Sequence, residues 1–218
     1  MTGILVIMDF GEPFGGCIPG ARGAALAALM RTGAPMTGRQ IHRVASGGHS
    51  LWSIQEALKA LAALGLVETA AVGRAVLHSV NDRHVAAAPL RRLADPISLL
   101  REAARASVGS GALSIILFGS VARHESGVGS DIDLAVISHA PWDGAADLQS
   151  AITAQFGNAC DVLVFTEAEF ARLAASGEPV VEEILRDGIP LLSSMPTRRI
   201  LANNTLPAGS IALAGTTP

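Results

Sequence analysis

The sequence is poor in cysteine, in charge and in long apolar runs. Its two cysteines, Cys17 and Cys160, are too few for a disulfide framework and lack the spacing of a metal site, so we expect free thiols. Apolar runs such as 4–8 and 115–118 fall far short of the roughly 18 residues that a membrane span needs. Residues 1–17 have no basic stretch, which argues against a secretory signal. We therefore expect a cytoplasmic protein without membrane contacts.

The composition excludes disorder for most of the chain. Of the 218 residues, 50% are hydrophobic and 16% charged, and the mean hydropathy is +0.42. This length is sufficient for one or two domains, each with a core. Residues 194–218 differ from the rest, because they are rich in Thr, Asn, Gly, Pro and Ala and show no apolar periodicity. We expect a flexible tail over 194–218.

The net charge of −3 hides a difference between the two halves of the chain. Residues 1–93 carry 9 basic and 5 acidic side chains, whereas residues 94–218 carry 7 basic and 14 acidic ones. This asymmetry favours two parts with different partners, a mildly basic part suited to a polyanion and an acidic part rich in carboxylates. Chance scatter over a solvated surface remains an alternative interpretation.

Helical signals and a hairpin fill the first half. Thr37 is a plausible N-cap, and Gln40 stands where a capping box requires it. The third predicted helix has apolar residues at spacings of three and four, which gives it one apolar face. An alternating segment around Gly73-Arg74 predicts two short strands. The predicted elements are helices over 24–31, 38–45 and 50–64 and a hairpin over 66–80.

In this order of elements, residues 20–90 resemble a winged helix-turn-helix domain. In that family the third helix enters the major groove of DNA and the wing touches backbone phosphate. The resemblance places a set of polar residues near DNA, where Arg and Lys neutralise phosphate. These candidates are Arg39, Arg43, Gln55, Lys59 and Arg74. Because many winged helices dock proteins or dimerise, and the basic excess is small, a partner-binding role stays open.

The second half contains a turn suited to phosphate. The apolar run 113–118 predicts a buried strand, and it ends at Gly119-Ser120 before a short helix. Gly119 allows close approach of a ligand to the backbone, and Ser120 offers a hydroxyl beside unpaired N–H groups. The segment is not a Walker A loop, because it lacks both the glycine spacing and the lysine.

A pair of aspartates follows ten residues after Ser120. Asp131 and Asp133 fall near the start of a predicted strand over 130–137. Residues i and i+2 of a strand point to the same face, about 7 Å apart along the backbone. Like charges so close raise each other's pKa unless a cation intervenes, and Mg²⁺ takes one or two carboxylates together with substrate phosphates. The spacing therefore indicates a site for a metal ion and a phosphate-bearing ligand.

These two stretches resemble the signature of the DNA polymerase β-like nucleotidyltransferase superfamily, most closely its minimal branch, over residues 96–192. They read Leu117-Phe118-Gly119-Ser120-Val121-Ala122-Arg123 and Ser130-Asp131-Ile132-Asp133-Leu134. The resemblance implies a third carboxylate on a neighbouring strand, and Asp161 supplies it at the head of the apolar run 160–165. It also implies that Arg123 aids phosphate binding, although an ion pair with Glu125 or Asp131 would leave the same sequence. Residues 178–191 resemble the closing helix and final strand of the family, with Gly188 after the helix at the C′ position.

The resemblance implies a metal-dependent enzyme that transfers a nucleoside monophosphate from an NTP such as ATP to a hydroxyl of a protein or tRNA, as in toxin–antitoxin pairs. Asp131, Asp133 and Asp161 would be catalytic and would hold two Mg²⁺ ions, while Gly119, Ser120 and Arg123 would bind the nucleotide. We expect an α+β protein in which a winged helix precedes a nucleotidyltransferase domain with a small mixed sheet. Two alternatives remain, a winged-helix regulator that senses a nucleotide without turnover and an antibiotic-modifying nucleotidyltransferase.

Overall fold

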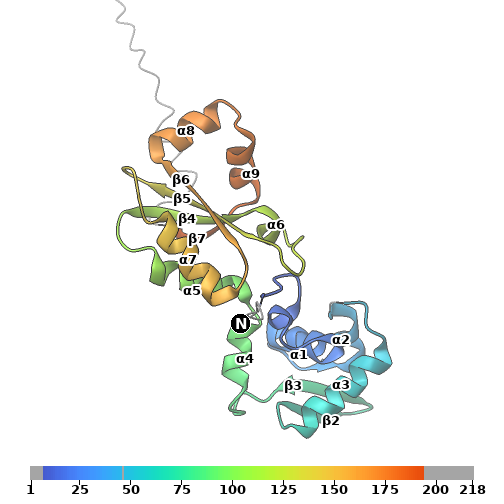
Figure 1. The fold of residues 1–218 in the computed structure, drawn as a ribbon. Coiled ribbons are helices and arrows are strands. Elements are labelled where there is room, and N and C mark those ends of the chain that lie inside the picture. Colours follow the sequence, from blue (N-terminus) through green and yellow to red (C-terminus); the bar gives the residue numbers. More distant parts are fainter. Residues whose placement is uncertain (1–6, 46, 194–218) are drawn as a thin grey trace, which may run out of the picture.

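The computed structural model describes residues 7–45 and 47–193. The elements fall into two groups along the chain, seen in Figure 1 as a blue-to-green part and a green-to-red part. The tail expected over 194–218 lies outside the described residues. No helix in the described ranges is both long and apolar enough to cross a bilayer.

The first group combines helices with a small antiparallel sheet of order β1-β3-β2. The three expected helices and the hairpin are all present. The short strand β1, the helix α4 and the 3-10 turn η1 are additions that the sequence pattern did not indicate. The elements are η1 Pro13–Gly16, α1 Gly20–Thr32, β1 Met36–Thr37, α2 Gly38–Val44, α3 Leu51–Ala63, β2 Val67–Val72, β3 Ala75–Val80 and α4 Ala87–Leu93.

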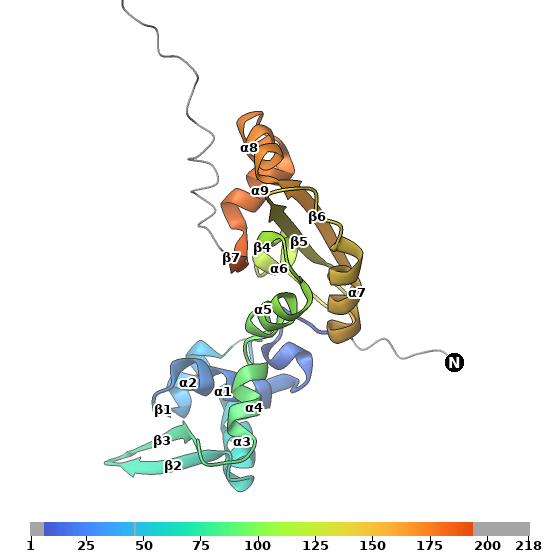
Figure 2. The same cartoon turned by 90° about the vertical axis from the view of Figure 1, so that its left-hand side faces the viewer.

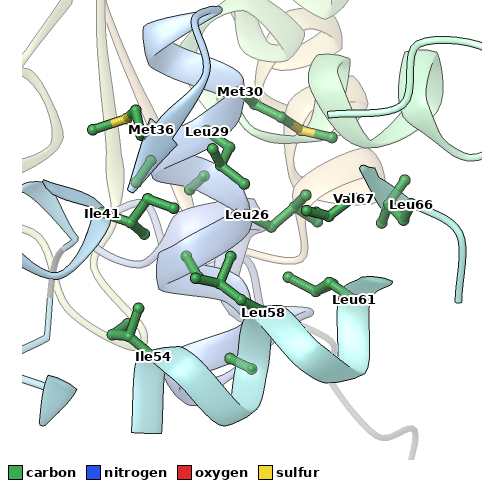
Figure 3. Close-up of a cluster of buried hydrophobic side chains, with 14 of the residues drawn as sticks. Leu26, Leu29, Met30, Met36, Ile41, Ile54, Leu58, Leu61, Leu66 and Val67 are labelled. Atoms are coloured by element: carbon green, nitrogen blue, oxygen red, sulfur yellow. The ribbon is translucent and has the colours of Figure 1, made fainter. Parts of the chain in front are cut away.

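Local signals account for the helix boundaries in this group. The capping box is formed, because the Thr37 hydroxyl accepts from the backbone N–H of Gln40 and the Gln40 side chain accepts from the Thr37 N–H. Ser50 caps α3 by accepting from a backbone N–H 3.1 Å away. The apolar face of α3, with Ile54 and Leu58, packs on α1 in a shared core (Figure 3). The amphipathic pattern therefore buries the face that it predicts.

The second group is built on a mixed four-stranded sheet of order β6-β5-β4-β7. Strands β5 and β6 are parallel, while β4 pairs antiparallel with β5 and with β7. The α+β class with a small mixed sheet is thus confirmed for this part. Its elements are α5 Pro96–Ser107, β4 Ala112–Phe118, α6 Gly119–Ala122, β5 Ile132–Ser138, α7 Ala145–Phe156, β6 Cys160–Thr166, α8 Glu167–Ala175, α9 Pro179–Asp187 and β7 Ile189–Ser193.

Helices cover both faces of this sheet (Figure 2). On one face, Ile132 and Leu134 of β5 belong to a core shared with α5 and α7. On the other face, Ala135 and Ile137 belong to a core shared with α8 and α9. Because side chains alternate along a strand, Asp133 has the parity of Ala135 and points to the α8–α9 side. The sheet thereby places an acidic residue at the margin of an otherwise apolar layer.

Candidate active site

Asp133 and Asp161 occupy paired positions on adjacent strands. Asp133 is the second residue of β5, Asp161 is the second residue of β6, and the parallel register sets them opposite each other. Neighbouring strands lie about 4.8 Å apart, so the two carboxylates share one face at short range. Asp133 is half-buried and Asp161 is exposed. The expected meeting of these two acids is therefore present in the geometry.

The backbone of Gly119 lies directly against the side chain of Asp133. It follows β4 directly, and the last residue of that strand, Phe118, pairs with Asp133 across the sheet. The φ of Gly119 is +71°, a left-handed conformation that favours glycine. A Cβ at this position would lie 2.0 Å from Oδ2 of Asp133. Any side chain here would thus displace the carboxylate. Both the left-handed backbone and this close approach therefore require glycine at position 119.

The pKa of Asp133 is raised above its ordinary value. Burial is the largest cause, and the charges of Asp161, Asp131 and Glu183 act in the same direction. Arg123 opposes them by lowering the pKa. Several carboxylates therefore lie close together, and the Arg123 guanidinium offsets part of their charge at Asp133. Such a cluster stabilises an added cation.

Asp131 is held differently from the other two acids. The strand expected over 130–137 begins only at Ile132, so Asp131 is an exposed loop residue and the i, i+2 argument for this pair was wrong in detail. Asp131 is still close enough to raise the pKa of Asp133 through its charge. The buried Asn158 fixes the loop, because its Nδ2 donates to the carbonyl of Ser130 at 2.9 Å. Sequence reasoning did not single out Asn158.

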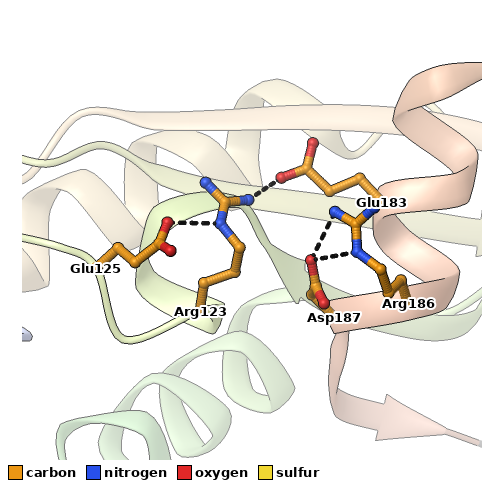
Figure 4. Close-up of polar contacts among 5 residues, drawn as sticks. All are labelled: Arg123, Glu125, Glu183, Arg186 and Asp187. Carbon is orange, nitrogen blue, oxygen red and sulfur yellow. Dashed lines mark hydrogen bonds and ion pairs between the residues drawn. The ribbon is translucent and has the colours of Figure 1, made fainter.

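The nucleotide-binding candidates other than Gly119 lie on and after α6. Ser120 is half-buried on that short helix. Arg123 forms ion pairs with Glu125, at 2.8 Å, and with Glu183 of α9 (Figure 4). Of the two alternatives left open for Arg123, the described residues show the ion pair with Glu125, and Glu183 is a second partner that the sequence did not indicate. Its role toward a nucleotide stays a prediction.

The carboxylates of Asp133 and Asp161 suit a hard divalent cation whose remaining coordination positions are filled by substrate oxygens. Among residues 7–45 and 47–193, no group of three or more His, Cys, Asp or Glu side chains is arranged to hold a metal ion by itself. Asp133 and Asp161 nevertheless provide paired carboxylate oxygens, which are the ligands Mg²⁺ prefers, and Mg²⁺ commonly uses only one or two of them beside phosphates and water. Burial is the first cause of the raised pKa of Asp133, and the neighbouring carboxylates, whose charges also raise it, are groups whose mutual repulsion a bound cation would offset.

The residues expected to face DNA are all exposed in the structure. They come from α2, α3 and the turn of the hairpin, and they are Arg39, Arg43, Gln55, Lys59 and Arg74. Lys59 is paired with Glu56 of the same helix at 2.7 Å, so its charge is partly offset. Trp52 of the same helix is 70% exposed. The set is accessible to a partner.

Comparisons with known proteins bear on the second half of the chain. Residues 110–196 match the family model described as Polymerase beta, Nucleotidyltransferase. The matched segment includes the Gly119-Ser120 turn and all three aspartates. No curated protein sequence matches the chain.

Two solved structures that match part of the chain are of toxin–antitoxin proteins. One is a crystal structure of a mutant of the toxin–antitoxin MntA–HpeT, with a TM-score of 0.37 and 16% sequence identity. The match covers 49% of this chain and 81% of the MntA–HpeT chain. The other is a crystal structure of a toxin–antitoxin with AMP-PNP, with a TM-score of 0.36 and 20% sequence identity. The match covers 50% of this chain and 79% of the other chain.

Proposed function

We propose that the protein is a Mg²⁺-dependent nucleotidyltransferase that moves a nucleoside monophosphate from an NTP to a hydroxyl of a protein or tRNA. The observation that carries the proposal is the register of β5 and β6, which pairs Asp133 with Asp161 next to the backbone of Gly119. The family match over residues 110–196 supports the same class of reaction. Two Mg²⁺ ions and membership of a toxin–antitoxin pair belong to this proposal as the sequence resemblance implies them.

Each residue has a distinct role in the proposal. Asp131 and Asp133 would hold Mg²⁺ together with the triphosphate, and Asp161 would complete the site nearest the acceptor hydroxyl and accept its proton. When bound, the metal supplies positive charge that offsets charge on the attacking and leaving oxygens. Gly119 lets the triphosphate approach the backbone, and Ser120 offers its hydroxyl to phosphate oxygens. Arg123 adds the cationic side chain at this end of the sheet.

A labelling experiment tests the proposal. The purified protein is incubated with Mg²⁺ and each NTP labelled at the α-phosphate, in lysate of its native cell. We expect the label to pass to a protein or an RNA, whereas label at the γ-phosphate stays with released pyrophosphate. Asp133→Ala abolishes the transfer, and Asp143→Ala, at an exposed aspartate outside the site, leaves it intact. Equal transfer by the wild type and Asp133→Ala would contradict the proposal.

The first group of elements supports a second candidate function, a winged-helix module that binds DNA or a protein partner. Its order of helices and strands and the sheet order β1-β3-β2 agree with that fold, and its basic side chains are exposed. In a regulator, the nucleotidyltransferase fold would sense a nucleotide without turnover. We expect such a protein to retain its own promoter DNA in a gel-shift assay, with Arg74→Ala weakening all sequences about equally. Failure to retain any DNA would leave partner docking as the role of the module.

A further inference from the structure

Glu183 lies on α9, the helix that covers the face of the sheet to which Asp133 points. Its side chain is 29% exposed and forms an ion pair with Arg123, which is 31% exposed. The second partner of Arg123, Glu125, is more open to solvent, with 65% of its side chain exposed. Glu183 is therefore the more sheltered of the two partners of Arg123, and solvent screens an ion pair less when both partners are sheltered.

Arg123 is held close to the acidic site by this pair. Among the groups that shift the pKa of Asp133, Arg123 lowers it, whereas burial and the neighbouring carboxylates raise it. The guanidinium donates through Nε to Glu125 and through Nη1 to Glu183. These contacts use only part of the five-donor fork of an arginine, so N–H groups remain for an incoming oxygen. A guanidinium fixed in this way is suited to a phosphate, for which Arg is a preferred partner.

Arg186 of the same helix hydrogen-bonds a different carboxylate, although the charge of Glu183 also acts on it. Its Nε and Nη2 both donate to Asp187, at 3.0 and 2.9 Å (Figure 4). The two arginines are thereby assigned to different carboxylates, and Glu183 is directed to Arg123.

We propose that Glu183 is a positioning residue that holds Arg123 beside the acidic cluster so that its guanidinium binds a phosphate of the nucleotide. The inference rests on the proposed function and extends it to a residue of the closing helix. Glu183 acts through Arg123 and touches no substrate. Its own negative charge is unfavourable to a phosphate, so its benefit depends on the presence of the arginine.

Binding of unreactive nucleotides tests this role without turnover. The four α,β-methylene NTPs are titrated with Mg²⁺ into the full chain by calorimetry. We expect Glu183→Gln to raise the Kd of the preferred analogue about three- to tenfold, the scale of losing one well-placed charge-assisted contact. Glu183→Asp, which keeps the charge on a shorter side chain, gives a smaller rise. Glu182→Gln makes the same charge change at the exposed neighbouring position and leaves the Kd unchanged.

A double-mutant cycle separates positioning from a general structural effect. In an Arg123→Ala background, Glu183→Gln causes no further loss of affinity, because the residue it positions is absent. Equal losses in both backgrounds, or no loss when Arg123 is present, would overturn the inference while leaving the proposed function intact. A wild-type protein that binds none of the four analogues would overturn both.

Discussion

Replacing Asp133 by asparagine should stabilise the folded protein at neutral pH in the absence of divalent cations. The change keeps the shape of the side chain and removes one negative charge from a half-buried position opposite Asp161. Like charges directly opposite on neighbouring strands destabilise by an amount comparable to other cross-strand pairs, up to about 1 kcal/mol. For a chain of this length that free energy corresponds to an increase in Tm of about 2–4 °C.

The gain should depend on pH in one direction. The pKa of Asp133 is raised in the folded state, first by burial and then by neighbouring carboxylates, so ionisation of this group is less favourable after folding. Its protonated form supports the fold fully at acidic pH, below the ordinary value of 3.8, and this support is lost as pH rises through the raised pKa. The asparagine does not titrate. The difference in Tm therefore appears as pH rises from about 4 to 7.

Thermal unfolding in EDTA, followed by circular dichroism from pH 4 to 7, measures this difference. Asp143→Asn serves as the control, because that aspartate is exposed and lies outside the cluster. Adding Mg²⁺ should then raise the Tm of the wild type more than that of Asp133→Asn, since a ligand stabilises the state that binds it. A variant less stable than the wild type at pH 7, or a difference that does not change with pH, would refute the electrostatic reasoning.

Three further predictions concern other residues of the chain. Gly119→Ala should lower nucleotidyl transfer more than about tenfold, because the new methyl group meets the Asp133 carboxylate and the left-handed backbone is unfavourable for alanine; activity at the wild-type level would contradict this. Asn158→Ala should reduce the free energy of unfolding by about 1–3 kcal/mol in a urea titration, since it removes the hydrogen bonds that the buried Asn158 amide makes to the backbone of Met8 and Ser130. Burial, aided by nearby acids, raises the pKa of the Cys160 thiol to about 12, so iodoacetamide at pH 8 should label only Cys17 in the native protein, as peptide mass spectrometry would show.

Local patterns in the sequence were sufficient to predict most of the elements. The capping box at Thr37 and the apolar periodicity of α3 are signals carried by neighbouring residues, and both are confirmed. Strand β1 is only two residues long, and its conformation depends on pairing with β3, which lies about forty residues further along the chain. Helix α4 has no side-chain cap at its N-terminus, so its sequence carries no start signal. Contacts distant in sequence therefore account for both omissions.

Gly188 shows how a correct boundary can rest on the wrong reason. The sequence predicts a left-handed C′ glycine after the closing helix, but the φ of Gly188 is −64°, in the extended region. The glycine is needed for packing instead, because a Cβ there would lie 2.3 Å from the carbonyl oxygen of Ile184 and 2.7 Å from Cγ2 of Ile116. The second of these contacts comes from β4, so only the folded structure reveals it.

The candidate site was predictable where its residues follow one another closely in the chain. The Gly119-Ser120 turn and the two aspartates after it are read from local spacing, and the family resemblance added Asp161. Glu183 was not predictable, because it reaches Arg123 only through the approach of α9 to α6, sixty residues apart. The domain boundaries along the sequence and the roles of the site residues stay predictions.

The central claim is that Mg²⁺ and a triphosphate bind at the edge of the sheet where Asp133 and Asp161 meet. Crystals grown with Mn²⁺ in place of Mg²⁺ and an α,β-methylene NTP would locate the ion directly through its anomalous scattering. We expect an anomalous peak within about 2.0–2.3 Å of carboxylate oxygens of this pair, with the triphosphate beside Gly119. A bound nucleotide with its metal elsewhere in the protein, or with Asp133 and Asp161 both outside the coordination sphere, would contradict the account.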